Sequence, residues 1–139
     1  MKASACIILI LFLISGVNGP VLAAAPAHKH APSPEMRRQH DSMSVTKKQW
    51  AVLKKSLAAG DFAAADASLV RMQKAAGALD KFKIHKNADR MEEFREQSRI
   101  YRENLTELGK ALKEQDQGRA EGLSKTIDQG CLQCHQTFR

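Results

Sequence analysis

Apolar side chains recur at helical spacing from residue 34 to residue 139, and no stretch alternates as a β-strand does. Four successive stripes follow the helical repeat, the first in steps of seven, seven, three and four residues and the other three in steps of three or four. Each is long enough for an amphipathic helix, so the pattern predicts an all-α fold. Their members are Met36, Met43, Trp50, Leu53 and Leu57; Phe62, Ala65, Leu69, Met72, Ala76 and Leu79; Met91, Phe94, Ser98, Tyr101, Leu105, Leu108 and Leu112; and Ala120, Leu123, Ile127, Cys131, Cys134 and Phe138.

Boundary signals separate the four predicted helices. Ser33 stands before a proline, and this pair favours a helix that begins at residue 34. Gly60 suits the left-handed end of a helix, and Asp61 can cap the next one. Asn87 is predicted to cap the third helix, and residues 115–118 form the turn before the fourth. The connectors are short, so we expect an antiparallel up-down four-helix bundle.

Two features modify this picture. Residues 41–46 include several poor helix formers, which allow a kink or break in the first helix. The core is also thin, because residues 25–139 hold only four Phe, one Trp and one Tyr, while alanine fills many inward positions. Such a core leaves room for a large apolar group. Tyr101 is expected to pack in the core with a polar end that needs a partner.

The N-terminal segment differs sharply from the rest. Residues 1–24 carry Lys2 and then an apolar run over 7–14 that is too short to span a bilayer, so we predict a secretory signal peptide cleaved after Ala23 or Ala24. Residues 25–33 are expected to form a flexible Ala/Pro/His leader, and residues 34–139 the folded domain. Export predicts a periplasmic protein without stable membrane insertion.

Length and charge narrow the classes of function. The 139 residues allow one core and exclude multidomain enzymes and large barrels. The 22 Lys and Arg outnumber the 15 Asp and Glu, a net charge of +7. Export and the lack of base-stacking aromatics beside the basic residues argue against nucleic acid. The less compensated lysines are suited to steering an acidic redox partner: Lys47, Lys48, Lys54, Lys55, Lys81, Lys83 and Lys86.

The most informative segment is Cys131-Leu132-Gln133-Cys134-His135, a C-x-x-C-H motif typical of covalent haem attachment. Two thiols on one helical turn can reach the two vinyl groups of one porphyrin, and His135 can offer an imidazole nitrogen to the iron. A disulfide or redox pair is an alternative, but a redox pair expects a βαβ setting. A zinc site would need a further ligand, such as His28 or His30 from the leader.

With this motif in its last predicted helix, the sequence CLQCHQTFR (131–139), and an all-helical run before it, the chain resembles the class II c-type cytochromes, the cytochrome c prime and cytochrome c556 group. The resemblance covers residues 34–139. It implies one haem c per chain, buried between the helices, attached through Cys131 and Cys134 of the final helix, with His135 as the fifth iron ligand. It also suggests that Arg139 pairs with a haem propionate, with Arg37 and Arg38 as further candidates, and that the protein is a monomer or homodimer.

The sixth iron position decides the function. In c556-like members a methionine of the first helix binds the iron, and Met43 is the preferred candidate here, with Met36 in reserve and His40 as a competitor. We therefore expect a non-enzymatic electron carrier with His/Met-ligated, low-spin iron. One alternative is a pentacoordinate haem protein that binds nitric oxide or another small gas, and another is a colourless binding module with a Cys131–Cys134 disulfide.

Overall fold

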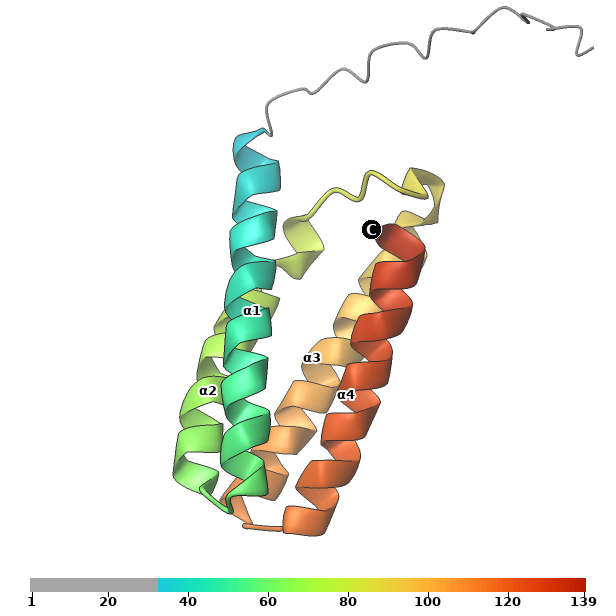
Figure 1. Cartoon of the computed structure of the whole chain (residues 1–139). Helices are drawn as coiled ribbons and strands as arrows, with labels where there is room; N and C mark the ends of the chain where they lie inside the picture. Colours follow the sequence, from blue (N-terminus) through green and yellow to red (C-terminus); the bar gives the residue numbers. More distant parts are fainter. Residues whose placement is uncertain (1–32) are drawn as a thin grey trace, which may run out of the picture. The chain divides into compact units, whose positions relative to one another are not determined.

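The computed structural model of the protein describes residues 33–139; the predicted signal peptide and all but the last residue of the predicted leader lie outside the described residues. The described chain forms four α-helices that pack in sequence, α1 on α2, α2 on α3 and α3 on α4, as an up-down bundle (Figure 1). The all-α prediction of four helices is confirmed. Their bounds are α1 Pro34–Ala58, α2 Phe62–Ala76, α3 Met91–Lys113 and α4 Gln117–Phe138, with short 3₁₀ turns η1 at Leu79–Lys81 and η2 at Ala88–Arg90.

Helix α1 starts as its sequence predicts and runs further than its propensities suggest. The Ser33 hydroxyl accepts a hydrogen bond from the Met36 backbone N–H at 3.1 Å, which is the expected N-cap. The helix continues without interruption through residues 41–46, so the expectation of a break there is wrong. A contact with α2 helps to hold this stretch, because the Ser42 hydroxyl donates to the Ala75 carbonyl at 3.0 Å.

The two tight turns of the bundle have the same design. Gly60, between α1 and α2, and Gln115, between α3 and α4, adopt positive φ angles of 70° and 54°. Each is followed by an aspartate cap, since Asp61 accepts from Ala64 N at 2.9 Å and Asp116 accepts from Arg119 N at 3.0 Å. The first turn was predicted in detail. In the second, the sequence carries glutamine where glycine is the usual residue.

The connector between α2 and α3, residues 77–90, corrects one prediction. Asn87 does not cap α3: its own backbone is left-handed, with φ 56° and ψ 48°, and α3 begins only at Met91 without a side-chain cap. The Asn87 side chain is used elsewhere, because its Nδ2 donates to the Thr137 carbonyl of α4 at 2.6 Å. The connector is thereby fastened to the last turn of the bundle.

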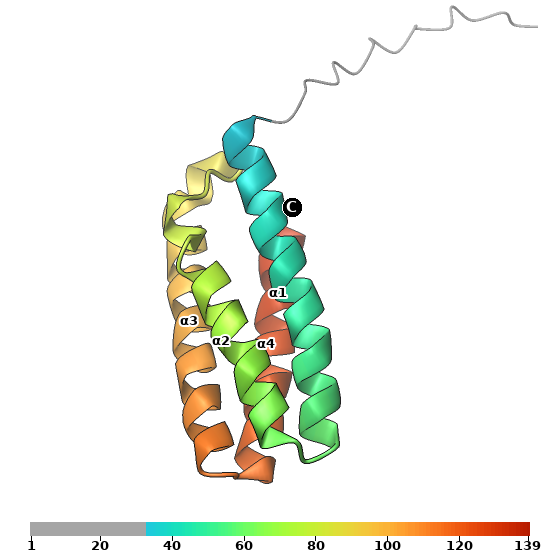
Figure 2. The ribbon, with the colours of Figure 1, turned by 90° about the vertical axis from the view of Figure 1, so that its left-hand side faces the viewer.

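The bundle has one large buried cluster and a smaller one, of Ile84, Phe94 and Phe138. Its two ends differ in their connections. We call these the turn end, which holds the two tight turns, and the connector end, which holds the start of α1, the 77–90 connector and the last turn of α4 (Figure 2). The largest fully buried side chains are Leu53, Leu69, Met72, Leu105, Leu108 and Ile127. Several members of the predicted stripes are only half-buried. Phe62 and Leu123 lie toward the turn end, and the others lie further toward the connector end: Met36, Met43, Met91, Tyr101, Cys131 and Cys134.

Helix α1 meets α4 less extensively than α1 meets α2 or α3 meets α4. Figure 1 shows the two ribbons moving apart from the turn end toward the connector end. Apart from Leu123, the half-buried stripe residues of α1 and α4 therefore lie where the two helices diverge. Within residues 33–139, no helix has the length and apolarity needed to cross a membrane.

Candidate functional site

Helix α4 presents the C-x-x-C-H residues on one face. Cys131, Cys134 and His135 lie three and four residues apart within an unbroken helix, so their side chains point to the same side. Cys131 is half-buried against the main core, and Cys134 is half-buried against a second cluster of Ile84, Phe94 and Phe138. His135 is exposed. The two cysteines are not joined in a disulfide.

The surroundings keep all three groups in their neutral forms at pH 7. Burial raises the pKa of Cys131, and the Asp128 carboxylate adds to the rise. Burial, with a smaller contribution from Cys131, raises the pKa of Cys134 to about 11. Desolvation by the surrounding protein atoms, and then the positive charge of Arg139, lower the pKa of His135. Raised thiol pKa values are the opposite of what a dithiol redox pair uses, whereas a neutral imidazole is the form that binds metals.

A polar contact sets the register between α1 and α4. Trp50 Nε1 donates to Asp128 Oδ1 at 2.6 Å, and Lys54 Nζ lies 2.9 Å from Asp128 Oδ2. The two helices run in opposite directions (Figure 1). Seven residues are close to two turns of helix. Moving two turns from this contact toward the connector end therefore leads from Trp50 to Met43 on α1 and from Asp128 to His135 on α4.

This register separates the candidates for the sixth ligand. Met43 belongs to the helix turn of α1 that faces His135 across the bundle, and its side chain is half-buried against the core cluster that Cys131 also contacts. Met36 lies two turns further along α1, at a level beyond the last turn of α4, and lines a hollow beside the connector. His40 is exposed. Met43 is therefore the candidate whose position suits a group held by α4.

The connector end also gathers positive charge. The hollow that Met36 lines, of about 480 Å³, lies between the start of α1 and the connector, with Phe82 on its apolar side. Its charged and titratable lining comprises one acid, Glu35, and four basic side chains from both segments, Arg38, Lys81, Lys83 and His85. Arg139 is exposed at the end of α4, and its charge acts on His135. Of the lysines expected to steer a partner, all are exposed; Lys54 pairs with Asp128, and Lys86 donates to the Gln136 carbonyl at 2.9 Å.

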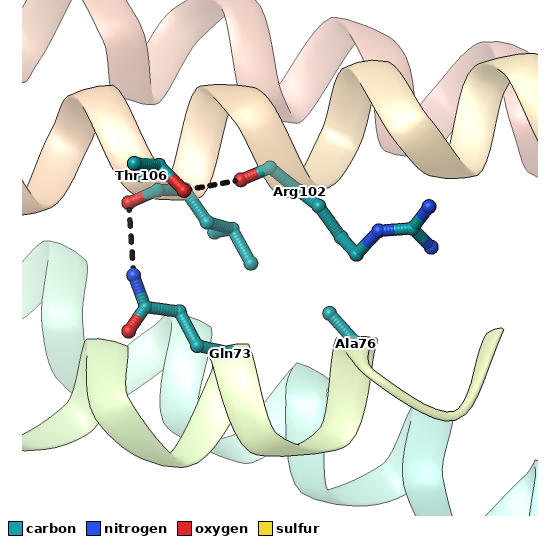
Figure 3. A pocket seen from close by; sticks show the side chains of 5 residues that line it. Gln73, Ala76, Arg102 and Thr106 are labelled. Carbon is teal, nitrogen blue, oxygen red and sulfur yellow. Dashed lines mark hydrogen bonds between the residues drawn. The ribbon is translucent and has the colours of Figure 1, made fainter.

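A smaller pocket of about 310 Å³ lies between α2 and α3, away from the motif (Figure 3). Gln73 Nε2 crosses it to donate to the Leu105 carbonyl at 3.3 Å, and the Thr106 hydroxyl donates to the Arg102 carbonyl at 3.0 Å. Its walls contain none of the cysteine, histidine or methionine candidates. We assign no function to this pocket.

Two features of the site were not predicted from the sequence. One is the contact between Trp50 and Asp128, for which an aspartate seven residues before His135 was the available signal. The other is the Tyr101 hydroxyl, which is buried without a hydrogen-bond partner. The sequence predicted that Tyr101 lies in the core, but it did not predict that the hydroxyl would lack a hydrogen bond.

Comparison of the chain with protein-family models gives no match, and comparison with curated proteins gives none either. Within residues 33–139, no three His, Cys, Asp or Glu side chains converge to hold a metal ion; His28 and His30 lie outside the described residues. The functional assignment accordingly rests on the residues described above.

Proposed function

We propose that the chain is a periplasmic c-type cytochrome that carries single electrons through one covalently attached haem. The observation that carries this proposal is the C-x-x-C-H motif on one face of α4, with both cysteines packed against the core and His135 level with the helix turn of α1 that contains Met43. When bound, the haem supplies an iron that cycles between Fe(II) and Fe(III).

The residues present fit such a group. Cys131 and Cys134 would hold it through two thioethers: each S–H adds across one vinyl double bond, the sulfur bonding to one carbon and the proton going to the other. His135 would be the fifth ligand through a neutral imidazole nitrogen. The half-buried apolar residues of α1, α3 and α4 suit a flat, mostly apolar ring, because contact with it would remove their remaining exposed surface from water.

The charges at the connector end agree with this placement. A haem carries two propionate carboxylates, and the basic side chains of the hollow, together with Arg139 at the end of α4, would favour their ionised form. Met43 on α1 would be the sixth ligand. Iron held by His135 and Met43 would favour a relatively high reduction potential. The exposed lysines would steer an acidic redox partner and raise its rate of encounter.

A mass measurement tests the proposal. The full chain is expressed in a host that matures c-type cytochromes, exported, denatured and weighed. We expect the mass of one haem to remain on the polypeptide, and to be absent from the double variant Cys131→Ala/Cys134→Ala. Lys113→Gln, an exposed position at the end of α3 and away from the attachment motif, serves as the control that keeps the added mass. Bare polypeptide from the parent chain in that host would overturn the proposal.

A further inference from the structure

Side chains of the connector cap the last turn of α4. An α-helix leaves its last four backbone carbonyls without partners inside the helix, and α4 ends at Phe138. In this turn, the Gln136 carbonyl accepts a hydrogen bond from Lys86 Nζ at 2.9 Å. The next carbonyl, that of Thr137, accepts from Asn87 Nδ2 at 2.6 Å. Two neighbouring residues of the connector therefore supply donors to two neighbouring carbonyls of α4.

An apolar contact holds the same turn from a second side. Phe138 is only 8% exposed and meets Phe94 of α3 edge to face, with the ring centres 5.5 Å apart. Ile84 of the connector is buried in the same cluster, and Cys134 packs against that cluster. The connector thus contributes both the polar support of this turn and part of its apolar support.

Asn87 suits this position through its backbone as well as its side chain. Its φ of 56° and ψ of 48° are left-handed, a conformation that glycine adopts without strain and that asparagine tolerates better than most residues. Glycine would therefore satisfy the backbone here, and what asparagine adds is its amide. The residue is half-buried, so water replaces its hydrogen bond to Thr137 poorly when that bond is lost.

His135 depends on this turn for its direction. The residue is exposed, follows Cys134 and directly precedes the two capped carbonyls. The backbone of its own turn sets the direction in which a helical side chain points. If the last turn frays, the imidazole no longer shares a face with the two cysteines.

We propose that Asn87 is a positioning residue of the haem site: by donating to the Thr137 carbonyl, it keeps the last turn of α4 helical and the His135 imidazole directed at the iron. This inference rests on the proposed function. Asn87 acts on His135 only through the backbone of α4. Lys86 supports the preceding carbonyl in the same way, but its hydrogen bond is exposed and water competes with it.

The main test is Asn87→Gly, which removes the amide and leaves a residue suited to the left-handed backbone. Gln115→Gly is the matched control, because Gln115 has a similar φ of 54° in a turn at the opposite end of the bundle. In the purified full chain, we expect the backbone amides of the last turn of α4 to exchange hydrogen several-fold faster in Asn87→Gly, as loss of one hydrogen bond predicts. Gln115→Gly is expected to leave their exchange unchanged.

A spectroscopic reading separates positioning from a purely structural cap. In the Met43→Leu background, His135 would be the only axial ligand, and resonance Raman scattering reads the stretching band of its bond to ferrous iron. We expect Asn87→Gly to shift and broaden this band, and Gln115→Gly to leave it unchanged. Asn87→Asp keeps the size of the side chain but offers no donor at pH 7, so it is expected to act like Asn87→Gly.

The outcomes distinguish this inference from the haem proposal. Faster exchange with an unchanged iron–imidazole band would mean that the cap does not position His135, which overturns the inference while the haem proposal stands. Unchanged exchange in Asn87→Gly, or parent-like behaviour of Asn87→Asp, would overturn the inference as well, because the hydrogen bond would then contribute nothing. Parent protein without haem would overturn both.

Discussion

Trp50 and Asp128 join the first and last helices of the bundle through a hydrogen bond of 2.6 Å from the indole Nε1 to the carboxylate Oδ1. Lys54 adds to this contact, with its ammonium 2.9 Å from the same carboxylate and 5.4 Å from the centre of the Trp50 ring. The contact lies between two helices that otherwise meet little. It is therefore the natural target for testing how the candidate site is held in register.

Asp128→Ala is expected to destabilise the protein by about 1–3 kcal/mol, because the Trp50 N–H would keep its place in the core without an acceptor. Trp50 is only 9% exposed, so water reaches it poorly. The measurement is urea unfolding of the purified protein. Trp50→Phe provides the partner for a double-mutant cycle: in that background, Asp128→Ala should cost clearly less. Equal costs in the two backgrounds would show that the hydrogen bond contributes nothing.

The same carboxylate predicts a pH dependence. Partial burial by itself would raise the pKa of Asp128, but the Trp50 hydrogen bond and Lys54 lower it below its usual 3.8. A carboxyl with a lowered folded-state pKa adds stability above its unfolded pKa and loses it as the pH falls through the folded value. Thermal unfolding of the parent and of Asp128→Asn should differ by a constant amount above about pH 5 and converge in stronger acid. A gap that does not change with pH would contradict this explanation.

Replacement of the two methionines of α1 tests the assignment of the sixth ligand. Met43→Leu is expected to remove the red sulfur-to-iron band and convert low-spin iron to high-spin, because leucine cannot bind iron. Met36→Leu, two turns away, should retain the parent absorption spectrum. The opposite pattern would transfer the role to Met36. A parent spectrum that is already high-spin and shifts with nitric oxide would favour the gas-binding alternative.

The second tight turn can be improved by one substitution. Gln115 holds a positive φ of 54°, which costs an L-residue with a side chain about 1–2 kcal/mol. Gln115→Gly is therefore expected to raise the free energy of unfolding by about 0.5–1 kcal/mol, after allowance for the greater freedom of glycine in the unfolded chain. Gly60→Ala, at φ 70° in the first turn, should lower it. Chemical denaturation of both variants compares the signs; a loss of stability in Gln115→Gly would refute the prediction.

Gly109 of α3 packs closely against the Leu69 side chain of α2. A Cβ at this position would lie 3.2 Å from Leu69 Cδ2, so Gly109→Val is expected to cost about 1–3 kcal/mol through overpacking. Gly122 in α4 has nothing within 4 Å of the same added atom, and Gly122→Ala should stabilise the protein by about 0.5–1 kcal/mol through helix propensity. Differential scanning calorimetry measures both. Stabilisation by both substitutions would show that helix propensity outweighs packing at Gly109, and destabilisation by Gly122→Ala would contradict the propensity argument.

Short sequence signals predict the fold well where the interacting residues are close together in the chain. The four stripes place the helices, and the Ser33 and Asp61 caps are found where the sequence suggests them. Asn87 could not be assigned from its neighbours, because its side chain donates to a carbonyl 50 residues away in α4. Helix α1 likewise continues through residues 41–46, where Ser42 contacts α2. The helix propensities of residues 41–46 carry no information about that contact.

The sequence predicts the chemistry of the candidate site, but it does not predict at which level along the bundle the site lies. Spacing alone places Cys131, Cys134 and His135 on one helical face. The choice between Met36 and Met43 needs the register between α1 and α4, which depends on a contact between residues 78 positions apart. The unmet hydrogen bond of Tyr101 is also a property of three helices together.

The repeated three-residue turn design has a consequence for how the chain folds. Residues 59–61 and 114–116 join neighbours into two helical hairpins, so much of the bundle's packing is between segments close together in sequence. Proteins of such low contact order fold in roughly microseconds to milliseconds. The closure of α1 onto α4 is the long-range step, and stopped-flow fluorescence of the single tryptophan, which reports on that closure, is suited to timing it.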